Sequence, residues 1–121
     1  MDRLDYKEDI HLSLISAEDT ISLRAKKQCI IIDIRQPFTS YQECHLKGSY
    51  HMDINEEGSY FETYSEFLGL YHENYPENLI LFIGNKSDSG HDFVMKLLTS
   101  PFTIGRTALV RGGIDAIILE C

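Results

Sequence analysis

Two segments of the chain are apolar and rich in β-branched residues: residues 29–34 and Leu79–Ile83. A strand that is covered on both faces has no polar side, so this pattern predicts two interior strands of a sheet. Shorter strand patterns occupy residues 11–15, 48–54 and Thr107–Val110. The chain is therefore predicted to hold about five strands.

The segments between these strands have the residue spacing of amphipathic helices. Ser16 followed by Asp19 is a capping-box pattern, which predicts the start of a helix that ends at the basic pair Lys26-Lys27. Residues 60–75 carry aromatic and apolar side chains three and four positions apart, and Pro76 ends that pattern. The other predicted helices are short: Phe38–Glu43, His91–Leu98 and a terminal one from about Ile114.

Strands that alternate with helices are typical of βαβ crossovers, which produce a mainly parallel sheet. We therefore predict a single α/β domain over residues 11–121. The polar and charged residues 1–10 are expected to form a flexible lead-in. A chain of 121 residues is long enough to bury a core of its own.

The charge of the chain argues against several classes of partner. Its formal net charge is −8, which suits neither nucleic acid nor an anionic membrane surface. No apolar run approaches the roughly 20 residues that span a bilayer, and the charged start of the chain shows no secretory signal. We therefore expect a cytoplasmic protein, or part of one, that binds no nucleic acid and does not insert into membranes.

The cysteines and histidines show no metal-binding or redox pattern. There is no CxxC pair, so we expect free thiols in a reducing compartment at Cys29, Cys44 and Cys121. The histidines lack the spacing of metal ligands: His11, His45, His51, His72 and His91. His45 is expected to form a structural hydrogen bond. No metal or other cofactor is predicted.

Four motifs follow one another along the chain: Asp33-Ile34-Arg35, His45-Leu46-Lys47-Gly48-Ser49, the strand–loop–helix from Leu79 to Leu98, and Val110-Arg111-Gly112-Gly113. In this order they resemble the rhodanese-like family. Cys44 and Ile117 depart from the family's usual glycine and aromatic residue at those positions. The resemblance covers residues 15–117 and implies a three-layer α/β fold, with a mainly parallel sheet of about five strands flanked by helices.

The resemblance also locates the loop that holds the nucleophilic cysteine in catalytic members. There, inward-pointing N–H groups and a helix N-terminus cradle an anion and lower the thiol pKa. In this chain Gly84 stands at the nucleophile position and Ser89 at that of a supporting arginine, and a shift by one residue brings in only Ile83 or Asn85. Asp88 would repel an anion. The loop, predicted to lack thiolate chemistry, is Gly84-Asn85-Lys86-Ser87-Asp88-Ser89-Gly90.

Other catalytic or ligand-binding chemistry has weaker support in the sequence. Ser87 or Ser89 could act as a nucleophile only if His91 served as its base, and a histidine near a helix start more often faces solvent. Asp33 and Arg35 could flank a ligand cleft at the carboxyl edge of the sheet, although a structural ion pair is favoured. The aromatic side chains of residues 60–71 are expected in the core, with an exposed patch for a partner as the alternative.

The leading functional hypothesis is a non-catalytic rhodanese-like domain that binds another protein or regulates it, as part of a larger signalling or trafficking protein. Residues 14–19, 83–85 and 112–114 resemble the domain in TBC-type Rab GTPase-activating proteins that also carry a kinase-like region. The alternatives are an active sulfurtransferase or cysteine-dependent phosphatase, and a scaffold with a small-anion pocket. The partner is not predicted.

Overall fold

The computed structural model describes residues 13–36, 38–53, 61–85, 91–98 and 106–117. Within these ranges strands and helices alternate: β1 (Ser13–Ile15), α2 (Ala17–Ala25), β2 (Cys29–Asp33), α3 (Phe38–Glu43), β3 (Tyr50–His51), α4 (Phe61–Asn74), β4 (Leu79–Ile83), α5 (His91–Leu98), β5 (Thr107–Val110) and the 3₁₀ helix η1 (Gly113–Ala116). The predicted lead-in 1–10 and the loop residues 86–90 lie outside the described residues.

The strands form one five-stranded sheet with the order β1-β5-β4-β2-β3, and every pairing is parallel. The two apolar segments, β2 and β4, are neighbours in the middle of this sheet, with Cys29 level with Leu79 and Asp33 level with Ile83. The predicted α/β fold with a parallel sheet is therefore confirmed. The strand order places the ends of β2 and β4 side by side at the carboxyl edge.

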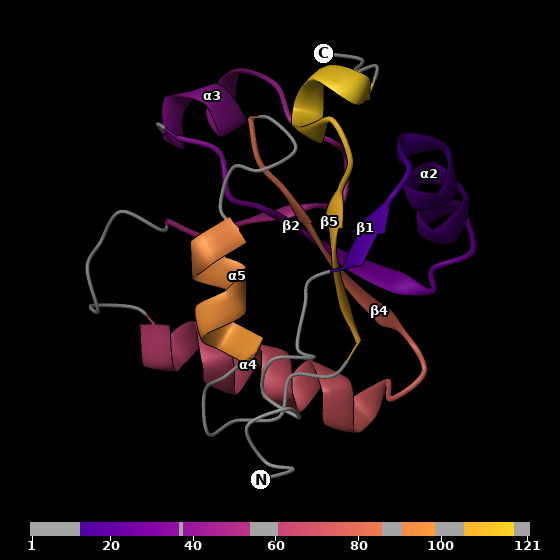
Figure 1. Cartoon of the computed structure of the whole chain (residues 1–121), viewed down its shortest axis with the longest axis vertical. Coiled ribbons are helices and arrows are strands. Elements are labelled where there is room, and N and C mark those ends of the chain that lie inside the picture. Colours follow the sequence, from indigo (N-terminus) through magenta and orange to yellow (C-terminus); the bar gives the residue numbers. More distant parts are fainter. Residues whose placement is uncertain (1–12, 37, 54–60, 86–90, 99–105, 118–121) are drawn as a thin grey trace, which may run out of the picture.

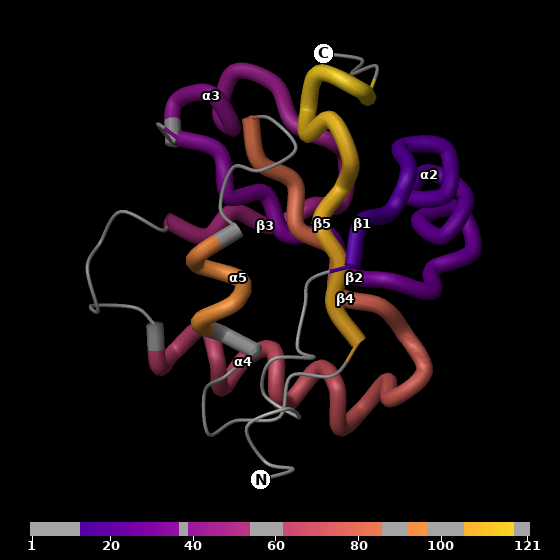
Figure 2. Tube along the Cα trace, in the orientation of Figure 1, coloured from indigo at the N-terminus to yellow at the C-terminus, as the bar shows by residue number. Residues whose placement is uncertain are grey.

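Helices cover both faces of the sheet, which explains why its central strands have no polar side (Figure 1). Ile30, Ile32 and Phe82 pack on one face with Leu68 of α4 and Val94 of α5. The alternate side chains of the strands pack on the other face with residues of α2 and η1; they include Ile31, Leu81, Ile83 and Val110. Ile117, which follows η1, packs in the same cluster. In Figure 2 the strands cross the middle of the molecule, with α4 and α5 on one side and α2 on the other.

Both ends of α2 follow from local backbone chemistry. The Ser16 side chain accepts a hydrogen bond from the Asp19 N–H at 3.0 Å, so the predicted N-cap is confirmed. At the other end Lys27 adopts a left-handed φ of 56°. This lets Gln28 N–H donate to the Leu23 carbonyl at 3.0 Å, the bond that closes a Schellman motif.

Two elements, β3 and the terminal helix, differ in the structure from their predicted forms. Strand β3 holds two residues, shorter than the predicted 48–54, because Gly48 has a φ of 90° and the Ser49 N–H and hydroxyl both bind the Leu46 carbonyl. These bonds keep residues 48 and 49 in a turn. The terminal helix is a 3₁₀ helix that begins at Gly113, behind Gly112 at φ 82°.

Candidate functional site

Gly84 lies directly after β4 at the carboxyl edge of the sheet and is buried. Its carbonyl accepts a hydrogen bond from the Ile114 N–H of η1 at 2.9 Å, and the preceding Ile83 carbonyl accepts one from the Ile34 N–H at 2.9 Å. The predicted nucleophile position is thus held between β2 and η1. Its φ is not left-handed, so the backbone conformation does not itself require glycine here.

The next residue, Asn85, is exposed, and its amide donates a long hydrogen bond of 3.5 Å to the Gln36 carbonyl. Gln36 in turn donates to the Asp53 carboxylate at 3.4 Å. The first two residues of the loop therefore border a polar rim formed by the ends of β2 and β3. The remaining predicted loop residues lie outside the described residues: Lys86, Ser87, Asp88, Ser89 and Gly90.

Asp33 and Arg35 form a buried ion pair beneath this rim. Arg35 Nε lies 3.0 Å from both carboxylate oxygens of Asp33 and its terminal nitrogen 2.8 Å from one of them. Only 1% of Asp33 and 7% of Arg35 is exposed. The Arg35 N–H also donates to Asp33, and the guanidinium donates to the Cys44 carbonyl at 2.7 Å. These contacts turn both groups toward the protein, which agrees with the favoured structural interpretation.

A side chain of α3 holds the turn that contains the motif His45-Leu46-Lys47-Gly48-Ser49. The Tyr41 ring stacks on His45 with centroids 3.8 Å apart, and Tyr41 donates to the Ser49 carbonyl at 2.7 Å. His45 Nδ1 lies 2.7 Å from the Tyr41 carbonyl, so its predicted structural hydrogen bond is confirmed. His51 Nε2 contacts the Arg35 carbonyl at 3.0 Å. Over the described ranges no three side chains of His, Cys, Asp or Glu gather as metal ligands would.

The order of these motifs is matched by one family model. The model of the rhodanese-like domain matches residues 16–120, which is most of the chain. The chain belongs to the rhodanese-like domain family. No curated protein matches it.

Solved structures share the fold of this rhodanese-like domain at low sequence identity. An uncharacterised protein from Saccharomyces cerevisiae is 16% identical with a TM-score of 0.61, over 88% of this chain and 91% of its own. A Staphylococcus saprophyticus protein is 15% identical with a TM-score of 0.58, over 91% and 100%. A Rhodopseudomonas palustris protein of unknown function, described as a possible tyrosine phosphatase, is 16% identical with a TM-score of 0.56, over 87% and 78%. At these identities the comparison shows the fold alone.

Two cysteines of this rhodanese-like domain lie in the described structure, Cys29 and Cys44. Cys29 is a free thiol at the start of β2, five residues along the sheet from the level of Gly84, or roughly 16 Å at the usual rise of a strand. Burial raises its pKa, and the positive charge of Arg24 offsets this only in part. A thiol with a raised pKa is a poor nucleophile at neutral pH.

Cys44 lies at the carboxyl edge, since its carbonyl binds Arg35. It is disulfide-bonded, so the prediction of three free thiols is wrong at this position. The odd number of cysteines and the lack of a CxxC pair gave no sign of the bond, because proximity in the fold is invisible in sequence spacing.

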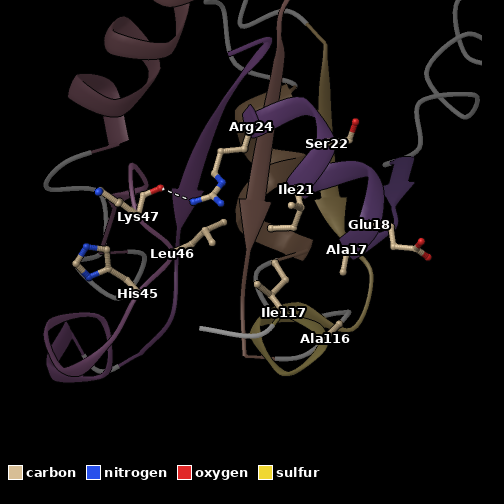
Figure 3. A pocket seen from close by; sticks show the side chains of 10 residues that line it. All are labelled: Ala17, Glu18, Ile21, Ser22, Arg24, His45, Leu46, Lys47, Ala116 and Ile117. Carbon is tan, nitrogen blue, oxygen red and sulfur yellow. Dashed lines mark hydrogen bonds between the residues drawn. The ribbon is translucent and has the colours of Figure 1, made fainter. Parts of the chain in front are cut away.

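The structure also holds an open groove of about 830 Å³ that no motif predicted (Figure 3). Its apolar floor is formed by Ile21 of α2, Leu46 and Ile117, and Figure 3 shows these side chains beneath α2. At one end Arg24 donates to the Lys47 carbonyl at 3.2 Å. Neither Gly84 nor the Asp33–Arg35 pair lines this groove.

In the described part of the chain no helix has the length and apolarity needed to cross a membrane.

Proposed function

We propose that this rhodanese-like domain is non-catalytic and acts as a protein-binding or regulatory module. The observation that carries the proposal is Gly84 at the end of β4, where the family's catalytic members carry their cysteine. Sulfur transfer and cysteine-dependent phosphate hydrolysis both begin with a thiolate at that position. A glycine offers no nucleophile of any kind.

The buried ion pair at the carboxyl edge supports the same conclusion. An anion-transferring site needs a positive group that is directed at the substrate. The Arg35 guanidinium is instead bound to Asp33 and to the Cys44 carbonyl, with 7% of the residue exposed. The pair serves the structure of the carboxyl edge rather than an incoming anion.

The competing function is an active sulfurtransferase or cysteine-dependent phosphatase. The observation that favours such an enzyme is the similarity in fold to a protein described as a possible tyrosine phosphatase. Among the described cysteines, the candidate nucleophile for such an enzyme is Cys44 in its reduced form, because it lies at the carboxyl edge. Loss of turnover in a Cys44→Ser variant would identify such an enzyme.

We further propose that the domain comes from a larger cytoplasmic protein of the TBC-type Rab GTPase-activating class with a kinase-like region. The support is the resemblance of residues 14–19, 83–85 and 112–114 to that class. Disulfides are rare in the cytosol, so the redox state of Cys44 in a cell lysate quenched with a thiol-blocking reagent tests the location. A reduced Cys44 supports the cytoplasm, whereas an oxidised one supports a secreted or lumenal location.

The binding function is tested by affinity capture from cell extract on the immobilised domain. A matched column carries a variant with charges reversed on the loop, Lys86→Glu with Asp88→Lys. The proposal expects at least one protein that the domain retains and a column of an unrelated acidic domain does not. Retention of nothing specific contradicts a binding module. Equal retention by the loop variant locates the binding surface away from residues 84–90.

A further inference from the structure

Large apolar side chains that remain exposed gather on and beside α4. Of the five such side chains among the described residues, four lie there: Tyr50 is 55% exposed, Phe67 40%, Leu70 58% and Tyr75 55%. The rings of Tyr50 and Phe67 meet edge to face at 6.1 Å. The half-buried Tyr71 ring lies 5.1 Å from that of Tyr75. Phe67, Leu70 and Tyr71 are three and four positions apart along α4, so they lie next to one another on the helix. One surface, which we name the α4 patch, is formed by Tyr50, Phe67, Leu70, Tyr71 and Tyr75.

The core does not account for this surface. Helix α4 buries Leu68 and Ser65 completely against the sheet side, and Tyr64 packs against the same core. Leu70 lies on the opposite side of the helix, where its side chain gains little from folding. Exposed apolar side chains that are grouped and bordered by polar residues mark sites of interaction with other molecules.

A row of glutamates runs along α4 beside the patch. Glu62, Glu66 and Glu73 are exposed and are four and seven residues apart, so they share one stripe of the helix. Like charges four residues apart destabilise a helix, and α4 contains no lysine or arginine that would relieve the repulsion. Glu77, also exposed, extends the negative charge just beyond the helix.

We propose that the α4 patch binds a short segment of a partner protein that combines apolar anchor residues with lysine or arginine. The anchors would cover Phe67 and Leu70 and the exposed ring of Tyr50, while the cationic side chains would face the glutamate row. Charge complementarity of this kind selects the partner and speeds association. The inference rests on the proposed binding function and names its surface and the chemistry of its partner.

The test begins with a phage-displayed library of random peptides selected on the folded domain. The selected peptides are synthesised, and their affinities are measured by fluorescence anisotropy. We expect sequences enriched in Lys or Arg together with Leu, Phe or Trp, with an affinity that falls at least about tenfold between low and high salt because exposed ion pairs are screened. Selected peptides that are acidic or neutral would overturn the proposal.

Three variants locate the binding surface. Glu66→Lys with Glu73→Lys reverses the row, and Leu70→Gln removes an anchor that the core does not use; each should weaken binding at least about tenfold. Glu43→Lys with Asp115→Lys makes the same change in net charge at exposed positions elsewhere and should leave binding within about twofold. Circular dichroism confirms that all variants are folded.

Unchanged affinity in the two α4 variants overturns the proposal, as does a library that yields no binding peptide. Neither result decides whether the domain binds proteins at another surface, which the affinity capture from cell extract tests separately. Catalytic turnover by the unmodified domain would instead overturn the proposed function and would not bear on where peptides bind.

Discussion

The Arg35 guanidinium lies against the Asp33 carboxylate at the end of β2, with Nε 3.0 Å from both oxygens and with almost no solvent on either residue. Buried pairs of this kind are costly to break from one side, because the remaining charge has lost its partner. The pair also joins β2 to the turn before His45 through the Cys44 carbonyl. The Asp-x-Arg motif thus stabilises the edge on which Gly84 lies.

Replacing Arg35 by methionine is therefore expected to lower the free energy of unfolding by about 3–5 kcal/mol. The double variant Asp33→Asn with Arg35→Met should lose less than the sum of the two single variants, since it leaves no unpaired charge. Urea denaturation measures the free energy of unfolding of both single variants and of the double variant. Arg111→Met, at an exposed arginine, is the control and should stay within about 0.5 kcal/mol of the unmodified protein. An Arg35 variant as stable as this control contradicts the structural role.

Two serines associated with helices should respond to alanine in opposite directions. The Ser65 hydroxyl is fully buried in α4 and has no hydrogen-bond partner among the described residues, so Ser65→Ala should raise the free energy of unfolding by about 1 kcal/mol. Ser16 caps α2 through the Asp19 N–H, so Ser16→Ala should lower it by about 1 kcal/mol. Thermal unfolding of the two variants compares the signs directly. A loss of stability in Ser65→Ala would show that its hydroxyl is satisfied.

The Cys44 disulfide should stabilise the domain by restricting the unfolded chain. Cys44→Ser is expected to lower the free energy of unfolding by about 2–4 kcal/mol under oxidising conditions. A dithiol reductant should produce a similar loss in the unmodified protein and no further loss in the variant. Cys29→Ser is the matched control, because Cys29 is a free thiol. Equal stability of the two serine variants would mean that no bond forms at Cys44.

The Cys29 thiol should react slowly with alkylating reagents. Burial raises its pKa above the usual value of 9.0, so at pH 8 less of it is thiolate than in the unfolded chain, and the thiolate is the reactive form. Iodoacetamide labelling followed by mass spectrometry should show a slower rate for the folded protein than for the urea-unfolded one, and a rate that keeps rising above pH 9. Equal rates in the two states would contradict the burial of this thiol.

The sequence predicted the sheet well because the physical signal was local. The isoleucines of β2 and the apolar run of β4 can be stable only between two layers of helices, and both strands were predicted nearly to the residue. The Ser16 cap and the helix at Phe38–Glu43 depend on neighbours in sequence and were also predicted. The turn residues Gly48 and Ser49 were assigned to a strand, because their hydrogen bonds to Leu46 were not foreseen.

The site was predicted less completely, because its properties depend on distant segments. Gly84 was located from the register of β4 and α5, and both elements are present at the predicted residues. The aromatic stripe was expected in the core. Tyr64 and Tyr71 do pack there, but Phe67 is 40% exposed against Tyr50. Periodicity gives the faces of a helix without showing how far the sheet extends beneath them.

The transfer of sulfur from thiosulfate to cyanide tests whether this domain carries thiolate chemistry, because the reaction passes through a cysteine thiolate in the family's catalytic members. Thiocyanate formation is followed for the unmodified chain, kept reduced, beside a variant in which Cys29, Cys44 and Cys121 are all serine. We expect that neither protein forms thiocyanate above the rate in buffer. Saturable turnover by the unmodified chain would contradict this expectation, and turnover that survives in the triple variant would show that the loop at Gly84 uses a nucleophile other than cysteine.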